Sequence, residues 1–140
     1  MALPSDFDEM YADAARFGVI DESIDAIDKR AARAIGSMAA AVGTSTQMGA
    51  ADWAGDVLRE TKEAIHKEIC AVDRSGLKSD YSKLLDQALT KDGISYVAGV
   101  VVQVVSAIHP GLAVSSVVLY LSIWLIKRGL NHWCTVPYPV

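Results

Sequence analysis

The sequence ISYVAGVVVQVVSAIHPGLAVSSVVLYLSIWLI, residues 94–126, contains no Asp, Glu, Lys or Arg. All 17 acidic residues and all but two of the 13 basic residues precede it, and the two exceptions, Lys127 and Arg128, follow it directly. A stretch of this length without charge is too apolar to form a protein surface, so it is expected in a protein core or in a bilayer. Its location therefore decides the architecture.

Small and polar side chains within residues 94–126 favour helices. The many valines keep two apolar strands as an alternative. The small or polar residues, however, fall at helical spacing in each half, and we expect them to form faces that pack closely against other helices. These residues are Ser95, Gly99, Gln103 and Ser106 in the first half and Gly111, Ser115 and Ser122 in the second. The sequence His109-Pro110-Gly111 between the halves disfavours a continuous helix and predicts a helical hairpin.

Four amphipathic helices are predicted upstream, within residues 1–92, from apolar residues that recur at steps of three and four. The expected helices extend from Ser5 to Gly18, from Asp21 to Val42, from Ala51 to Val72 and from Ser79 to Lys91. Residues 129–140 include Pro137 and Pro139 and predict an irregular tail. The fold class is therefore predicted as a single all-α domain over residues 1–140, a bundle of about six helices.

The charge distribution excludes one class of partner. The net charge is −4 and no basic stripe is present, which argues against nucleic acid as a partner. The first ten residues, MALPSDFDEM, lack the basic and apolar regions of a secretory signal, so we expect cytoplasmic synthesis without Sec export. Cys70 and Cys134 provide no disulfide framework and are predicted to be reduced.

No catalytic, cofactor or metal site is predicted. Glu63 and His66 have the E-x-x-H spacing of ferritin-like carboxylate sites, but such sites need a second copy and the chain has none. A zinc site that joins His66 and Cys70 to His132 and Cys134 is the alternative. The interpretation favoured for these side chains is ordinary surface and core-edge positions.

The sequence Trp53-Ala54-Gly55 resembles the W-x-G signature of small helical-hairpin substrates of type VII secretion. The resemblance covers roughly residues 20–75 and implies a turn at the motif. Here the predicted turn, residues 43–49, comes earlier, and the Y-x-x-x-[DE] export signal is missing. The competing interpretation is that Trp53 is a core residue of the third helix.

Both locations of residues 94–126 remain open from the sequence. Each half of about 15 residues rises about 22 Å, which is short of the roughly 30 Å hydrocarbon core. Several residues are nevertheless suited to a membrane interface, either as aromatic anchors or as a basic stop: Tyr120, Trp124, Lys127, Arg128 and Trp133. The alternative is that both halves form the centre of a soluble bundle.

The order of elements, amphipathic helices followed by an apolar hairpin, resembles that of colicin-type pore-forming domains. That resemblance rests on residues 94–126 and implies a hairpin that a bundle can release into a membrane. The expected function is therefore non-enzymatic: membrane association or insertion with helix-mediated self-assembly. The alternative is a soluble interaction, scaffold or coat subunit whose hairpin stays buried in the core or in a subunit interface. The expected partners are further copies, other protein subunits or a lipid bilayer.

Overall fold

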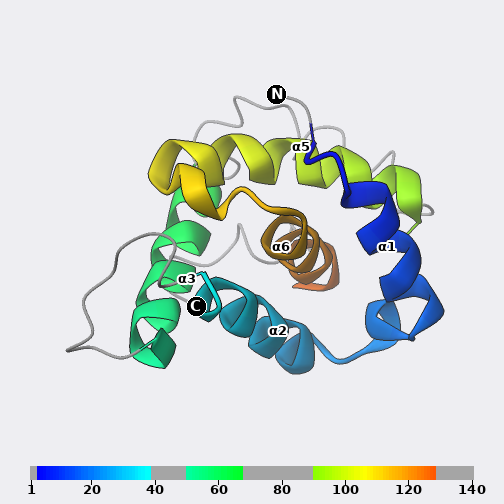
Figure 1. Cartoon of the computed structure of the whole chain (residues 1–140), viewed down its shortest axis with the longest axis horizontal. Helices are drawn as coiled ribbons and strands as arrows, with labels where there is room; N and C mark the ends of the chain where they lie inside the picture. The colour runs from blue at the N-terminus through cyan, green and yellow to red at the C-terminus, as the bar shows by residue number, and fades with distance from the viewer. Residues whose placement is uncertain (1–2, 39–49, 68–89, 129–140) are drawn as a thin grey trace.

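The computed structural model describes residues 3–38, 50–67 and 90–128. In these ranges the chain is all-α, with five α-helices, two short 3₁₀ helices and no strand (Figure 1). The elements are α1 (Phe7–Arg16), η1 (Val19–Asp21), α2 (Ile24–Gly36), α3 (Ala50–His66), α5 (Lys91–Ile108), η4 (Pro110–Leu112) and α6 (Ser115–Arg128). The strand alternative for residues 94–126 is therefore wrong.

Helix α6 forms the centre of the described structure. Ten of its residues are buried, from Ser115 to Ile126, and they cover its whole circumference. Helices α1, α2 and α5 all contact α6, and Figure 1 shows α6 nearly end-on with the other helices around it. Full burial of a Leu, Ile or Val side chain contributes roughly 1.5–3 kcal/mol, so α6 supplies much of the hydrophobic stabilisation.

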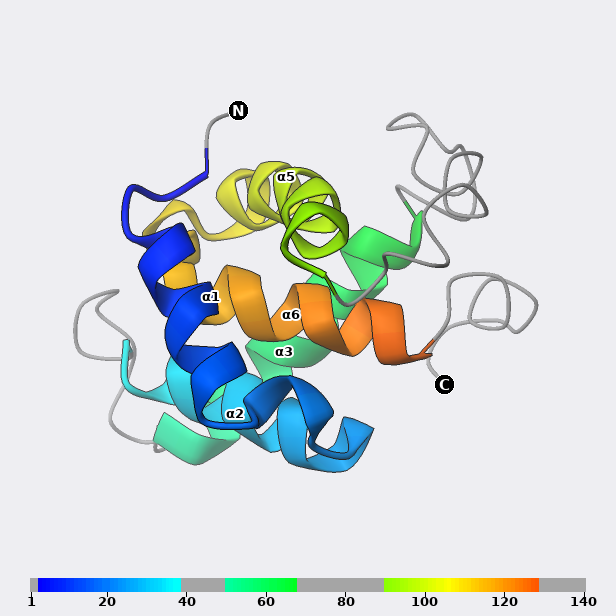
Figure 2. The same ribbon diagram turned by 90° about the vertical axis from the view of Figure 1, so that its right-hand side faces the viewer.

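The two apolar helices on either side of the predicted break cross steeply. Helix α5 appears lengthwise in Figure 1 and end-on in Figure 2, whereas α6 appears end-on in the first view and lengthwise in the second. The break at residues 109–111 falls where Pro110 predicts it. The hairpin itself is not confirmed, because η4 turns the chain so that α6 passes under α5 and on toward α2.

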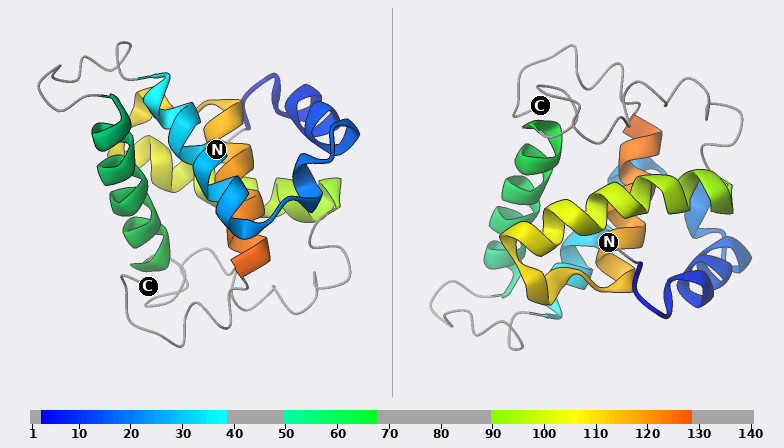
Figure 3. Two further views of the ribbon diagram at one scale, coloured as in Figure 1. Left: turned by 90° about the horizontal axis from the view of Figure 1, so that it is seen from below. Right: turned by 90° about the horizontal axis from the view of Figure 1, so that it is seen from above.

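Helix α3 closes one side of the bundle. It contacts α2 and α5, as Figure 3 shows. Val57, Leu58 and Ile65 of α3 are buried in the same hydrophobic core as α6. Because one core joins all five helices, the described residues pack as one unit.

Two helices start at positions that differ from the predicted ones. The first helix was predicted from Ser5, but α1 begins at Phe7, and the Asp6 carboxylate just before it accepts a hydrogen bond from the Ser115 hydroxyl at the start of α6. Helix α2 begins at Ile24, not near Asp21, because the hydroxyl of Ser23 accepts a hydrogen bond of 3.2 Å from the backbone of Ala26. Val19–Asp21 form the short helix η1 instead.

The residue at which the fourth predicted helix was expected to end belongs to α5. That end was predicted at Lys91, but Lys91 and Gly93 lie in the first turn of α5. The hydroxyl of Thr90 caps that turn by accepting from the backbone N–H of Gly93 at 3.4 Å, and Asp92 complements the helix dipole. The predicted positions 79–89 and the predicted turn 43–49 lie outside the described residues. The count of six helices therefore stays a prediction.

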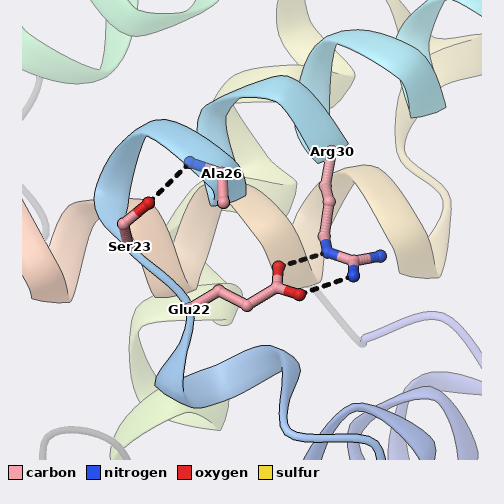
Figure 4. A network of polar contacts seen from close by, with 4 residues as sticks. All are labelled: Glu22, Ser23, Ala26 and Arg30. Atoms are coloured by element: carbon pink, nitrogen blue, oxygen red, sulfur yellow. Dashed lines mark hydrogen bonds and ion pairs between the residues drawn. The ribbon is translucent and has the colours of Figure 1, made fainter.

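An ion pair fixes the entry of the chain into α2. The Nε and Nη2 atoms of Arg30 donate to the two carboxylate oxygens of Glu22 at 2.5 and 2.7 Å (Figure 4). This bidentate geometry holds the pKa of Glu22 below its usual value and raises the pKa of Arg30. Glu22 precedes the helix and Arg30 lies on its second turn, so the pair ties η1 to α2.

Candidate helix-packing site

Helix α5 has one buried face and one open face, and neither carries a charge beyond its first turn. The buried face comprises Ile94, Val97, Ala98, Val101 and Val105, at spacings of three and four, and lies in the common core. The open face includes three exposed residues, Tyr96, Gln103 and Ala107, of which Tyr96 is 38% exposed. An uncharged open face on a helix 18 residues long is the most distinctive surface among the described residues.

The predicted packing face of α5 coincides with this open face. Gln103 is exposed, and Ser95, Gly99 and Ser106 are half-buried. An added Cβ at Gly99 would meet no atom within 4 Å, so a second helix could approach closely here without displacing the described chain. The described helices thus leave Gln103 exposed and space beside Gly99, and the packing of this face against a partner stays a prediction.

The predicted packing residues of the second half do not share this environment. Gly111 is exposed in η4, whereas Ser115 and Ser122 are buried in α6. The Ser122 hydroxyl donates to the backbone carbonyl of Val118 at 2.7 Å, which satisfies it inside the core. Because Gln103 on α5 is exposed, the two predicted faces do not form one buried interface between α5 and α6.

A groove borders the open face of α5. It has a volume of about 270 Å³ and is lined by Ala64 of α3 and by Gln103, Val104, Ala107 and Ile108 of α5. Its lining is mostly apolar and carries no charge. Figure 3 shows the end of α5 passing over α3 at this place. The groove extends the open face, so a docked helix would contact both α5 and α3.

Sequence reasoning missed part of this site. Tyr96, Gln103 and Ala107 recur at steps of seven and four, which is a helical signal. Only Gln103 belongs to the small and polar residues that predict the packing face, whereas Tyr96 and Ala107 belong to the otherwise apolar circumference of the helix. Ala64 carries no local signal, since its contribution depends on how α3 packs against α5.

The predicted membrane anchors lie mainly inside the structure. Trp124 is only 8% exposed, and Tyr120, Lys127 and Arg128 are half-buried. The Lys62 ammonium lies 4.1 Å from the centroid of the Trp124 ring and also pairs with the Asp28 carboxylate. In this fold the Trp124 ring thus packs against Lys62 of α3, and its role as a membrane anchor stays a prediction.

The remaining predicted membrane anchor and the alternative metal sites lie partly outside the described residues. Trp133 lies outside the described residues, as do Cys70, His132 and Cys134 of the alternative zinc site. Within the described ranges, no group of three or more His, Cys, Asp and Glu side chains is placed to hold a metal ion. Glu63 lies 3.5 Å from the Lys67 ammonium, one turn along the chain.

The turn between α5 and α6 contacts α3 through His109. Its Nε2 atom lies 3.7 Å from a carboxylate oxygen of Glu60 and is buried without a hydrogen-bond partner among the described residues. This places the turn against the middle of α3. The geometry offers a charge-assisted contact whenever the imidazole is protonated.

Of the described helices, α5 is long and apolar enough to cross a membrane. The core helices of soluble proteins pass the same test, and α5 buries one face in the bundle. Helix length and composition therefore agree with either location of α5.

The W-x-G motif lies in a helix, not in a turn. Trp53 is half-buried against the core in the first turn of α3, and Ala54 beside it is buried. The helical-hairpin resemblance requires a turn at this motif, so the core interpretation of Trp53 fits the structure. No family model, curated protein or solved structure matches this chain.

Proposed function

We propose that this chain is a non-enzymatic helical interaction protein that assembles with further copies through the open face of α5. The observation that carries the proposal is the uncharged surface of α5, from Ser95 to Ala107, in a chain with 30 charged residues in 140. Interface centres are depleted of charge in the same way. This is the scaffold or interaction class of function.

The positions of the small residues on α5 suit pairing between two identical helices. Gly99 lies near the middle of the helix, with Ser95 and Ser106 on the same side. A two-fold axis near Gly99 would bring the same patch of both copies together. Two-fold symmetry is the commonest symmetry of protein dimers. The groove beside α3 would accept side chains of the partner helix.

The substitution Gly99→Leu is expected to weaken self-association at least about tenfold, equivalent to about 1.4 kcal/mol. The added side chain would separate two closely packed helices, while the described chain leaves space for it. The matched control is Gly55→Leu, since Gly55 is an exposed glycine within α3 that also has no atom within 4 Å of an added Cβ. Sedimentation velocity over a concentration series measures the dissociation constant of each variant.

Two outcomes would contradict the proposed self-association through α5. If the wild-type chain stays monomeric at high concentration, it does not self-associate through α5. Equal weakening by Gly99→Leu and Gly55→Leu would show that the contact surface lies elsewhere. Circular dichroism of both variants confirms that the helices are retained.

A second proposal, conditional membrane association, is favoured by the length and composition of α5. Insertion of α6 would require loss of its contacts with α1 and α2 and of the Lys62–Trp124 contact. Flotation with liposomes at neutral and acidic pH separates the two proposals. Co-flotation would favour the membrane version, and a chain that assembles but does not float would favour the protein interface.

A further inference from the structure

We propose that an open cleft between α2 and α6, lying apart from the α5 face, binds a phosphate-type oxyanion. The cleft has a volume of about 310 Å³ and is lined by Arg30, Arg33, Ala34, Ser37, Ser116 and Tyr120. Small-molecule sites begin at about 300 Å³, so there is room for a small phosphate monoester. The proposed assembly through α5 uses none of these side chains.

The two helices present matching stripes to the cleft. Arg30, Arg33, Ala34 and Ser37 follow each other at steps of three, one and three and share one face of α2. Ser116 and Tyr120 lie one turn apart on α6. Because α2 and α6 pack closely along their lengths, both stripes are held on rigid helices and not on loops.

The charge of the cleft is positive in an otherwise acidic chain. Its lining contains two guanidinium groups and no carboxylate. Glu22, outside the lining, neutralises Arg30, but the third guanidinium nitrogen of Arg30 points away from Glu22 (Figure 4). Arg33 forms no ion pair with any described residue. One uncompensated positive charge therefore remains at the cleft.

The hydroxyl groups extend the set of donors. Ser116 and Tyr120 each contribute an O–H group to the lining, and the Tyr120 hydroxyl helps to raise the pKa of Arg30, so it lies close to that guanidinium. The Ser37 hydroxyl already donates to the backbone carbonyl of Ala34 at 2.8 Å, so it adds no free donor. Arginine with hydroxyl donors suits an oxyanion that accepts several hydrogen bonds, and phosphate has more acceptor oxygens than a carboxylate.

The test is a titration of the full chain with inorganic phosphate and with glycerol phosphate, followed by NMR at constant ionic strength. Saturable shifts of amides in α2 and α6 are expected. The variant Arg33→Gln should weaken binding about tenfold or more, since a hydrogen bond to a charged group contributes roughly 1.5–3 kcal/mol. The variant Lys29→Gln is the control, because it removes the same charge from an exposed position of α2 outside the cleft.

Three outcomes would overturn the proposal. They are amide shifts that do not saturate, equal weakening of phosphate binding by Arg33→Gln and Lys29→Gln, and an affinity for acetate as high as that for phosphate. A second readout is the melting temperature, which phosphate should raise in the wild type and in Lys29→Gln but not in Arg33→Gln. Tighter binding of glycerol phosphate than of inorganic phosphate would identify a monoester as the preferred source of the oxyanion.

Discussion

The substitution Leu119→Asp is expected to unfold the chain. Leu119 is 0% exposed in the middle of α6, where the surrounding side chains of the hydrophobic core are apolar. An unpaired carboxylate buried there would cost several kcal/mol, whether it stays charged or takes up a proton. Domains of this size are stable by only about 5–15 kcal/mol, so one such residue removes most or all of the stability.

The matched control for Leu119→Asp is Gln103→Asp. Gln103 is exposed on α5, so the new carboxylate remains in water and the helical content should be retained. Far-UV circular dichroism and thermal melting compare the two variants. A cooperative melt of Leu119→Asp at the wild-type temperature would show that α6 does not occupy the centre of the fold.

The substitution Phe7→Ala is expected to lower the free energy of unfolding by about 3–5 kcal/mol. Phe7 is 1% exposed and is the largest buried side chain of α1, the helix that covers one side of α6. Removal of its ring leaves a cavity that the neighbouring helices fill only in part. Chemical unfolding monitored by circular dichroism measures the change.

Phe17→Ala is the control for Phe7→Ala. Phe17 follows α1 directly, is 70% exposed and contacts the Arg16 guanidinium at 4.7 Å from its ring centroid. An exposed cation–π contact contributes only about 0.5–1 kcal/mol, so the expected loss is below about 1 kcal/mol. Similar losses at both positions would contradict the docking of α1 through Phe7.

The sequence was sufficient to predict the helical class and the break in the uncharged stretch. Pro110 lacks a backbone N–H and restricts His109, and both effects are local, so the break could be placed correctly. The steep crossing of α5 and α6 could not be predicted. It depends on the packing of α6 against α1 and α2, which are far from Pro110 in the sequence.

The orientation of α5 shows a second limit. Its small residues were expected to face a neighbouring helix, but the valines occupy the core and Gln103 is exposed. Burial of Val101 and Val105 removes more apolar area from water than burial of Ser95 and Gly99 would, which explains this rotation of the helix.

The environment of Trp124 required information from distant parts of the chain. Trp124 precedes Lys127 by three residues, which locally suggests an interfacial anchor. The Trp124 ring contacts the Lys62 ammonium, and the Asp28 carboxylate pairs with that ammonium. Lys62 belongs to α3 and Asp28 to α2. Only the packing of those helices shows that the ring is buried.

Amide hydrogen exchange of the full chain in detergent-free buffer tests the central position of α6 most directly. The account predicts that residues 118–126 exchange among the slowest in the protein, with protection close to the global free energy of unfolding. The open side of α5 is backed by the same core, so α5 should also be protected, but less strongly. Rapid exchange of residues 118–126 while α1 and α2 remain protected would contradict the account.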